Sequence, residues 1–220
     1  MIEHALGTVR QRIVAAASRA GRDPGSVTLV AVSKGRSVEE IQIAYDAGQR
    51  VFAESRPQEL ASKTPLLPAD VAWHFVGPLQ RNKVRLVRPA VALLHSLDRK
   101  SLAADWIKGK GQPPPALLQV NISHDPAKGG FDPMEVLPVA DELVGWGVPV
   151  RGVMTIPALS ENREETRDWF LALAEIGRRL ATTHPTASEV SMGMTDDFEL
   201  AIESGSTMVR VGRAIFEASY

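Results

Sequence analysis

The sequence predicts a single-domain α/β protein in which eight parallel strands alternate with helices and close into a (β/α)8 TIM barrel. Short apolar runs alternate with helix-length segments along its 220 residues, a pattern typical of parallel α/β folds. The first run, Val27–Val32, is almost wholly apolar, as expected of a strand buried on both faces. A doubly wound open sheet also alternates in this way. Eight units without a dinucleotide-binding glycine fingerprint favour the closed barrel.

Composition argues against several classes of protein. Hydrophobic residues make up 44% and charged residues 23% of the chain, close to soluble globular averages. The net charge of -1 argues against a general binder of nucleic acid or of anionic membranes. The chain has no cysteine, and its five histidines show no ligand spacing, so no metal site is predicted. Without a membrane span or a signal-peptide core, we expect a cytoplasmic protein.

The first half of the chain is predicted to form an opening helix and four strand–helix units. Apolar residues recur at helical spacing in residues 1–20, which indicates an amphipathic helix. Ser37 and Glu40 have the spacing of a capping box, and Asp98 is expected to cap a later helix. Strands are predicted at 27–32, 51–53, 71–76 and 92–97, with helices over 37–48, from about 57, through Leu79, Val84 and Leu86, and after Asp98.

The second half is predicted to add four more units. Residues 109–115 are loop-like but short, so they indicate a connector within one domain that spans residues 1–220. Residues 123–131 contain two adjacent glycines and are predicted to form a mobile loop on the active face. Strands are predicted at 116–122, 150–156, a short segment ending at Ser191, and 208–211, with helices at 133–146, 162–182 and 196–203.

Lys34 directly follows the first predicted strand. Parallel α/β folds carry their chemistry at the carboxyl ends of their strands. A lone lysine in such a loop is more often simply solvated, so its position gains significance only from the other end of the chain. There, Ser191–Met194, Gly205–Thr207 and Arg210–Gly212 look like a phosphate cradle that faces the lysine.

The loops after the last two strands of a barrel commonly bind a phosphate group with backbone N–H groups at a helix N-terminus. Gly193 is expected to let a phosphate approach the backbone, while Ser191 and Thr195 offer hydroxyl donors. Gly212 and Arg213 are expected to complete the cradle with backbone amides. The alternative is a routine helix cap and a turn, which each segment taken singly more often forms.

Several polar residues are predicted to lie on strands. Arg210 is a charged residue within a strand that should be buried, and buried arginines are usually paired. Its alternatives are a structural salt bridge with a barrel carboxylate and a cation held against a ring nitrogen of a cofactor. His74 and His95 are interpreted as core or barrel-lining groups. Glu54 is either an acid–base group or, as is usual at a strand end, a capping or salt-bridge partner.

Six segments in order along the chain carry a family resemblance: Leu29–Lys34, Trp73–Val84, His95–Arg99, Gln119–Ser123, Ser191–Glu199 and Gly205–Gly212. Together they resemble the pyridoxal 5′-phosphate (PLP) homeostasis protein family over essentially the whole chain. This family is a single-domain barrel similar to the N-terminal domain of bacterial alanine racemase, known as PLP fold type III. The resemblance therefore implies the same fold as the alternating pattern.

The resemblance also implies a function. The family binds PLP, buffers its free concentration in the cell and passes it to apo-enzymes, without established catalytic turnover. By position, Lys34 forms the Schiff base with PLP and Arg210 faces the pyridine nitrogen. Burial of Lys34 near Arg36 and Arg210 is expected to favour the neutral amine that this bond requires. The phosphate is implied to lie among Ser191, Gly193, Ser206, Thr207, Gly212 and Arg213.

Two positions depart from the family. After the second strand the family usually shows Gly-Glu-Asn, whereas this chain has Ala53-Glu54-Ser55. A hydroxyl thus replaces an amide near the cofactor, in a region that is also expected to contain His74. After Gly212 the usual threonine is Arg213, which either balances the phosphate charge or points to solvent.

Two other functions remain open: a PLP-dependent racemase-like enzyme, or another lysine Schiff-base barrel such as an aldolase, and a barrel that binds no cofactor. In the resembling racemases a tyrosine opposite the lysine comes from a separate C-terminal domain and a second subunit. This chain ends at Tyr220 after the eighth unit, and its other tyrosine, Tyr45, lies on a predicted helix outside the mouth. We therefore expect a monomeric PLP carrier with little or no racemase activity, whose partners are PLP and apo PLP-enzymes.

Overall fold

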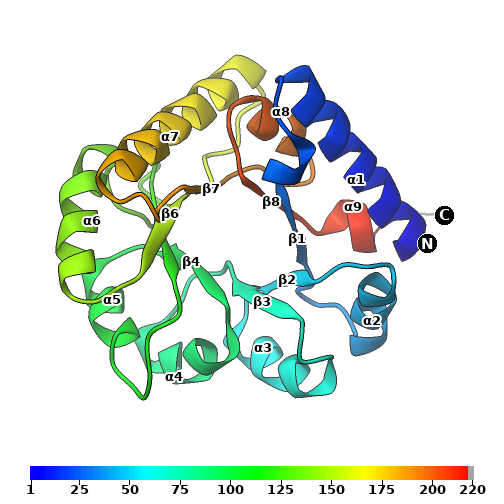
Figure 1. Cartoon of the computed structure of the whole chain (residues 1–220), viewed down its shortest axis with the longest axis horizontal. Helices are drawn as coiled ribbons and strands as arrows, with labels where there is room; N and C mark the ends of the chain where they lie inside the picture. The colour runs from blue at the N-terminus through cyan, green and yellow to red at the C-terminus, as the bar shows by residue number, and fades with distance from the viewer. Residues whose placement is uncertain (218–220) are drawn as a thin grey trace.

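A computed structural model describes residues 1–217 and shows eight parallel strands closed into one barrel (Figure 1). Each strand pairs with its neighbours in chain order, and β8 pairs with β1 through Val30 and Arg210. This closure confirms the (β/α)8 barrel and excludes the open doubly wound sheet. The strands are β1 (Thr28–Val32), β2 (Val51–Glu54), β3 (Ala72–Phe75), β4 (Leu93–Leu97), β5 (Ala116–Gln119), β6 (Val150–Met154), β7 (Glu189–Ser191) and β8 (Met208–Val211).

Helices surround the ring of strands (Figure 1). The N-terminal helix packs beside the last two helices and α2, and Arg12 ties it to Glu199 with an ion pair of 3.0 Å. Within residues 1–217, no helix is long and apolar enough to cross a membrane. The helices are α1 (Ile2–Arg19), α2 (Val38–Asp46), α3 (Pro57–Lys63), α4 (Val84–Val87), α5 (Lys100–Trp106), α6 (Val136–Gly145), α7 (Arg163–Thr183), α8 (Phe198–Glu203) and α9 (Arg213–Phe216).

Side chains alternate between two separate apolar clusters, as the period of two along a strand requires. The larger cluster lies between the strands and the helices and includes Phe52, Phe75 and Trp106. The smaller one fills the inside of the barrel: Val30, Ala53, Leu93, Leu117, Met154 and Met208. These inner side chains form an apolar plug, so that polar groups at the carboxyl ends of the strands stand above a closed floor.

Local predictions had mixed outcomes. The capping box is confirmed, because Glu40 N donates to Ser37 Oγ at 3.2 Å and Ser37 N donates to Glu40 Oε2 at 2.8 Å. Asp98 is not a helix cap: α5 begins after Arg99 without a side-chain cap, and Asp98 instead accepts a 2.5 Å hydrogen bond from the Arg99 guanidinium. That cap prediction was wrong because the ion pair occupies the carboxylate.

Several elements are shorter than predicted, among them β6, which ends at Met154 and not at residue 156. The helix expected through Leu79 and Leu86 is limited to Val84–Val87, with a 3-10 turn on each side. Pro89 cannot donate to an i−4 carbonyl, so α4 cannot continue. Strand β5 ends at Gln119, not Ile122, because the chain then folds back and Phe131 N donates to Gln119 O at 2.8 Å.

We expect Gly152→Ala to destabilise the barrel strongly. Gly152 lies in β6 with φ of 146°, and an added Cβ would lie 1.8 Å from the Glu189 carbonyl oxygen of β7. The loss in free energy of unfolding should be about 2 kcal/mol or more, measured by urea denaturation. Gly7→Ala is the matched control, since nothing lies within 4 Å of its added Cβ. It should stabilise α1 by about 0.5–1 kcal/mol. Unchanged stability of Gly152→Ala would contradict this packing.

Candidate functional site

Lys34 stands at the mouth of the barrel, just beyond the last residue of β1. Val30 and Val32 face the barrel interior, so the alternation of side chains directs Lys34 to the same side. Its side chain is exposed, and Arg36 is paired with Glu40 and Glu217. The prediction that Lys34 is buried beside Arg36 and Arg210 was therefore wrong, because the strand ends before Lys34 and the barrel opens there.

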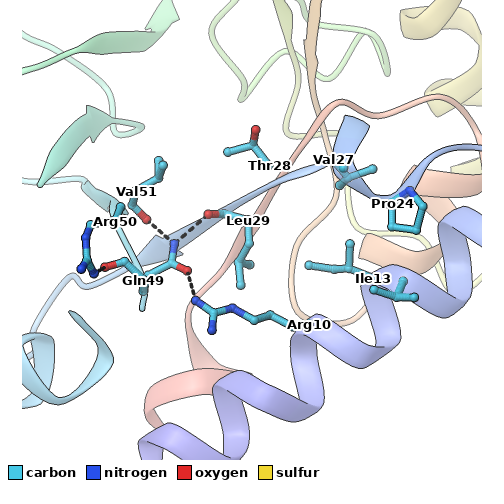
Figure 2. A pocket seen from close by; sticks show the side chains of 11 residues that line it. Arg10, Ile13, Pro24, Val27, Thr28, Leu29, Gln49, Arg50 and Val51 are labelled. Atoms are coloured by element: carbon cyan, nitrogen blue, oxygen red, sulfur yellow. Dashed lines mark hydrogen bonds between the residues drawn. The ribbon is translucent and has the colours of Figure 1, made fainter. Parts of the chain in front are cut away.

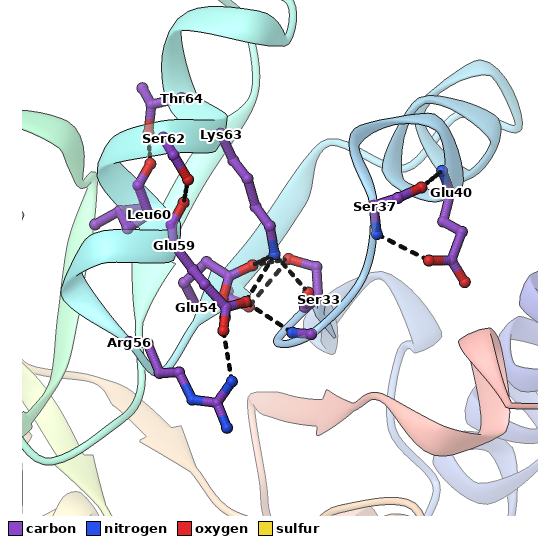
Figure 3. A network of polar contacts seen from close by, with 12 residues as sticks. Ser33, Ser37, Glu40, Glu54, Arg56, Glu59, Leu60, Ser62, Lys63 and Thr64 are labelled. Carbon is purple, nitrogen blue, oxygen red and sulfur yellow. Dashed lines mark hydrogen bonds and ion pairs between the residues drawn. The ribbon is translucent and has the colours of Figure 1, made fainter.

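A buried charged cluster lies behind the turn that carries Lys34 (Figure 3). Lys63, from α3, donates to Glu54 Oε1 at 2.6 Å, to Glu59 Oε2 at 3.0 Å and to the carbonyl of Ser33 at 2.9 Å. These three acceptors match the three N–H groups of its ammonium. Glu54 is fully buried, and burial raises its pKa against the hydrogen bonds from Lys63 and Ser33. Of the interpretations of Glu54, the structure shows the salt-bridge partner.

The same cluster holds both backbone groups that flank Lys34. On one side the Ser33 carbonyl accepts from Lys63, and on the other Gly35 N donates to Glu59 Oε2 at 2.7 Å. Partial burial acts to raise the pKa of Glu59, but hydrogen bonds from Gly35, Arg56 and Lys63 outweigh it and lower the pKa to about 2. Sequence reasoning missed Glu59 and Lys63, although their i, i+4 spacing after the second strand was the available signal.

A chain of hydrogen bonds crosses the inside of the barrel above the apolar plug. His74 Nδ1 lies 2.9 Å from His95 Nε2, and His95 Nδ1 lies 2.9 Å from Ser191 Oγ. Ser191 Oγ in turn accepts from Arg210 Nη1 at 2.6 Å. Burial lowers the pKa of His74 to about 4 and, with the charges of His74 and Arg210, lowers that of His95 well below its ordinary value. Both rings are therefore neutral at pH 7, as barrel-lining groups.

Arg210 is a buried cation for which the described part of the chain offers no counterion. It is 3% exposed, and besides Ser191 its guanidinium donates to the Thr155 carbonyl at 2.8 Å. Among residues 1–217, no carboxylate lies within ion-pair distance of it, so the salt-bridge alternative was wrong. Burial lowers its pKa to about 10, opposed by the charge of Asp197, and it remains protonated at pH 7. An uncompensated buried charge is costly, and an acceptor on a bound ligand would offset part of that cost.

The structure separates the residues predicted to surround a phosphate. The Ser191 hydroxyl lies inside the barrel between His95 and Arg210. Ser206 and Thr207 precede β8, at the opposite end of that strand from Gly212. Ser206 Oγ is fully buried against backbone carbonyls, and Thr207 Oγ1 lies 2.6 Å from Glu189 Oε2. These three side chains are not brought together with the turns after β7 and β8.

Those two turns lie side by side at the mouth, because β7 and β8 are neighbouring strands. Arg213 is exposed and forms an ion pair with Asp196, so the turn after β8 is linked to the turn after β7. Within the described chain, the backbone N–H groups of Thr195, Asp196 and Arg213 donate to no protein acceptor. Unpaired N–H groups of this kind are suited to an anion. The geometry thus fits a phosphate through backbone groups and Arg213.

Gly193 lies in the turn after β7 in a backbone conformation that favours glycine. Its φ is 89°, and an added Cβ would lie 2.5 Å from the Ala201 Cβ of α8. The glycine therefore allows α8 to pack closely against the turn, and the approach of a phosphate to its backbone stays a prediction. Ser55 follows β2 in the inward row of Val51 and Ala53. Its hydroxyl makes no hydrogen bond within residues 1–217, so it is available in the mouth.

A cavity lies at the other end of the barrel (Figure 2). It has a volume of about 470 Å³ between α1 and the amino ends of β1 and β2. Gln49 is its most buried polar group, and it donates to the carbonyls of Leu29 and Val51 at 2.8 and 2.7 Å while accepting from Arg10 at 3.3 Å. Because these groups already have partners, we assign this cavity a structural role.

The part of the chain that the structure describes holds no cluster of three or more Asp, Glu, His or Cys side chains that could bind a metal ion.

Comparison with known proteins identifies the family. Residues 5–219 match the family model described as alanine racemase, N-terminal domain. The pyridoxal phosphate homeostasis protein of Escherichia coli (strain K12) is 40% identical over 227 residues, which cover 99% of this chain and 96% of that protein. The chain belongs to the pyridoxal phosphate homeostasis proteins. The family resemblance predicted from its motifs is thus confirmed.

Solved structures agree with this family and fold. An unknown protein from Bifidobacterium adolescentis superimposes with a TM-score of 0.94 and 35% identity, covering 98% of this chain and 94% of that one. PipY of Synechococcus elongatus PCC7942, in a structure with PLP bound, has a TM-score of 0.80 and 32% identity, covering 98% of this chain and 100% of that one. This chain therefore shares its alanine-racemase-like barrel with a relative whose structure contains PLP.

The neutral histidine pair predicts a pH dependence of stability. In the unfolded chain His74 titrates near pH 6.5, whereas in the folded protein its pKa is about 4. The unfolded state therefore binds more protons between these values, and stability is present above pH 6.5 and falls as the pH drops toward 4. His74→Phe should remove on the order of 2 kcal/mol of this pH-dependent loss, measured by urea unfolding at pH 7 and pH 4. His4→Gln, at an exposed position of α1, is the control, and an equal loss in both variants would contradict the assignment.

Proposed function

We propose that this chain is a cytoplasmic, monomeric PLP carrier that holds PLP in the barrel mouth, buffers its free concentration and delivers it to apo-enzymes. One observation carries the proposal: a protonated, buried Arg210, with no counterion among residues 1–217, lies inside a barrel whose mouth bears Lys34. A ligand that pairs an acceptor for a guanidinium with a carbonyl group for an amine fits this arrangement, and PLP has both. The PLP-bound structure of PipY supports this choice.

The residues of the mouth divide the proposed binding among them. Lys34 is the covalent attachment point, as a Schiff base, and the cluster around Lys63 fixes its turn. Arg210 donates toward the ring nitrogen, and Ser55 lies beside the ring. The unpaired N–H groups at Thr195–Asp196 and Arg213, with the Arg213 side chain, bind the phosphate. When bound, PLP supplies a reactive carbonyl and an electron-withdrawing ring.

We propose that the family function is carried out without catalytic turnover. Arg210 keeps its own proton, so a ring nitrogen beside it must accept a hydrogen bond and stay unprotonated, which weakens the ring as an electron sink. Racemisation also needs a second base opposite Lys34. Tyr45 is half-buried near the end of α2, and its hydroxyl donates to Asp70 Oδ1 at 2.6 Å. The expectation for Tyr220 concerns a residue outside the described part of the chain.

Borohydride reduction tests the attachment point. After incubation with PLP, reduction and peptide mass mapping, we expect the pyridoxyl adduct on Lys34, together with a visible absorbance band before reduction. Lys34→Ala should lose both, because the Lys63 cluster holds the turn that carries Lys34 at the mouth. Lys110→Ala, in the exposed connector, is the control and should retain both.

Two outcomes would contradict the proposal in different ways. A yellow, reducible Lys34→Ala protein labelled at another lysine would reject Lys34 as the attachment point. Rapid Cα deuteration of L-alanine in deuterated water with formation of D-alanine, lost in Lys34→Ala, would replace the carrier with an enzyme.

Arg213→Ala tests the phosphate site. If Arg213 exchanges its exposed pairing with Asp196 for the phosphate, the variant should bind PLP about tenfold more weakly while its affinity for pyridoxal, which lacks the phosphate, is unchanged. Arg81→Ala removes another exposed arginine that is paired with an aspartate, Asp105, and should leave both affinities unchanged. Equal weakening of PLP and pyridoxal by Arg213→Ala would mean that Arg213 does not bind the phosphate.

A further inference from the structure

The arginine at one end of the polar chain sets the direction of its first hydrogen bonds. Arg210 can only donate, so Ser191 Oγ is the acceptor of the 2.6 Å bond from Nη1. The hydroxyl proton of Ser191 must then go to another acceptor. Within the described chain its remaining partner is His95 Nδ1, at 2.9 Å. His95 Nδ1 therefore accepts, and the neutral ring carries its proton on Nε2.

The same reasoning fixes the second histidine. His95 Nε2–H donates to His74 Nδ1 at 2.9 Å, so the proton of the neutral His74 ring lies on its own Nε2. The opposite arrangement would leave the Ser191 hydroxyl proton without an acceptor at a position that is 0% exposed. An unmade hydrogen bond in such a place costs about 1–3 kcal/mol. Only one set of proton positions satisfies the whole chain.

The free end of the hydrogen-bond chain, His74 Nε2, is reachable from the mouth. His74 lies on the inward row of strand residues, in register with Ala53, which is in register with Val32 of β1. The apolar plug closes the barrel on the other side. His74 is 6% exposed, and its Nε2 makes no hydrogen bond within residues 1–217 and is not among the enclosed unpaired atoms. A ligand in the mouth can therefore meet an Nε2–H donor there.

We propose that His74 binds an acceptor oxygen on the ring of the ligand, and that Ser191 and His95 are positioning residues that fix His74 as a donor. The identity of the ligand rests on the proposed function. PLP carries one ring oxygen, next to the aldehyde carbon and on the side away from the phosphate. With the phosphate at the turns after β7 and β8, that oxygen faces β2–β4, where His74 lies.

The proton positions can be tested in the ligand-free protein. Long-range ¹H–¹⁵N NMR at pH 7 should show His74 and His95 as neutral rings protonated on Nε2. Ser191→Ala should alter the tautomer of His95, because its Nδ1 loses the donor. Ser96→Ala is the matched control. Like Ser191, Ser96 is a buried serine, but it lies on β4 beside His95 and its hydroxyl donates to the Gly77 carbonyl. A ring protonated on Nδ1 in the wild-type protein would overturn the inferred direction.

Binding of two ligands tests the contact itself. The wild-type protein should bind PLP about tenfold or more tightly than 3-deoxy-PLP, which lacks the ring oxygen. His74→Phe should lose this preference, whereas His74→Gln, whose amide can donate, should retain much of it. An unchanged preference in His74→Phe would overturn the contact. Failure of the wild-type protein to bind PLP would overturn the proposed function and the ligand contact, while the NMR result would still decide the direction of the chain.

Discussion

The buried guanidinium of Arg210 is the constraint on which the rest of the site depends. A charge removed from water is stable only if hydrogen bonds or an opposite charge compensate it. Here Ser191 and the Thr155 carbonyl compensate it in part, and no carboxylate of the described chain does so. A ligand acceptor in the mouth would compensate the rest of the charge. Because Arg210 can only donate hydrogen bonds, it also fixes the proton positions of Ser191, His95 and His74.

A second charged group in the same barrel is compensated in the opposite way. Lys63 donates to two carboxylates and a carbonyl, so its charge is fully compensated within the protein. These contacts hold the backbone of the turn at Ser33 in place. This contrast separates a structural cation from one that is available to a ligand. The turn held by Lys63 carries Lys34 into the mouth with an exposed side chain. Stable support behind the turn and free access in front of it suit a lysine that binds and releases a ligand.

The strand pattern explains why so much of the architecture was predictable. Each of the eight apolar runs, and each helix between them, can be recognised from its own stretch of sequence. The pairing of β8 with β1 then closes the barrel. The positions of Lys34 and Gly212 followed from strand ends alone. The assignment of Ser191, Ser206 and Thr207 to a phosphate did not follow, because the stagger between neighbouring strands places residue 191 beside residue 208. Residues of the same sequence motif therefore do not all lie at the same turn of the barrel.

The sequence by itself determined the closed barrel, the family, and the presence of a lysine and a glycine-containing turn at strand ends, since each depends on local periodicity or on a motif. The tertiary structure alone decided which polar groups are partners. His74, His95, Ser191 and Arg210 lie on four different strands, and Glu59 and Lys63 meet the turn of another unit. Such contacts depend on barrel shear and on side-chain burial. They join residues up to 96 positions apart and leave no periodic trace in the chain.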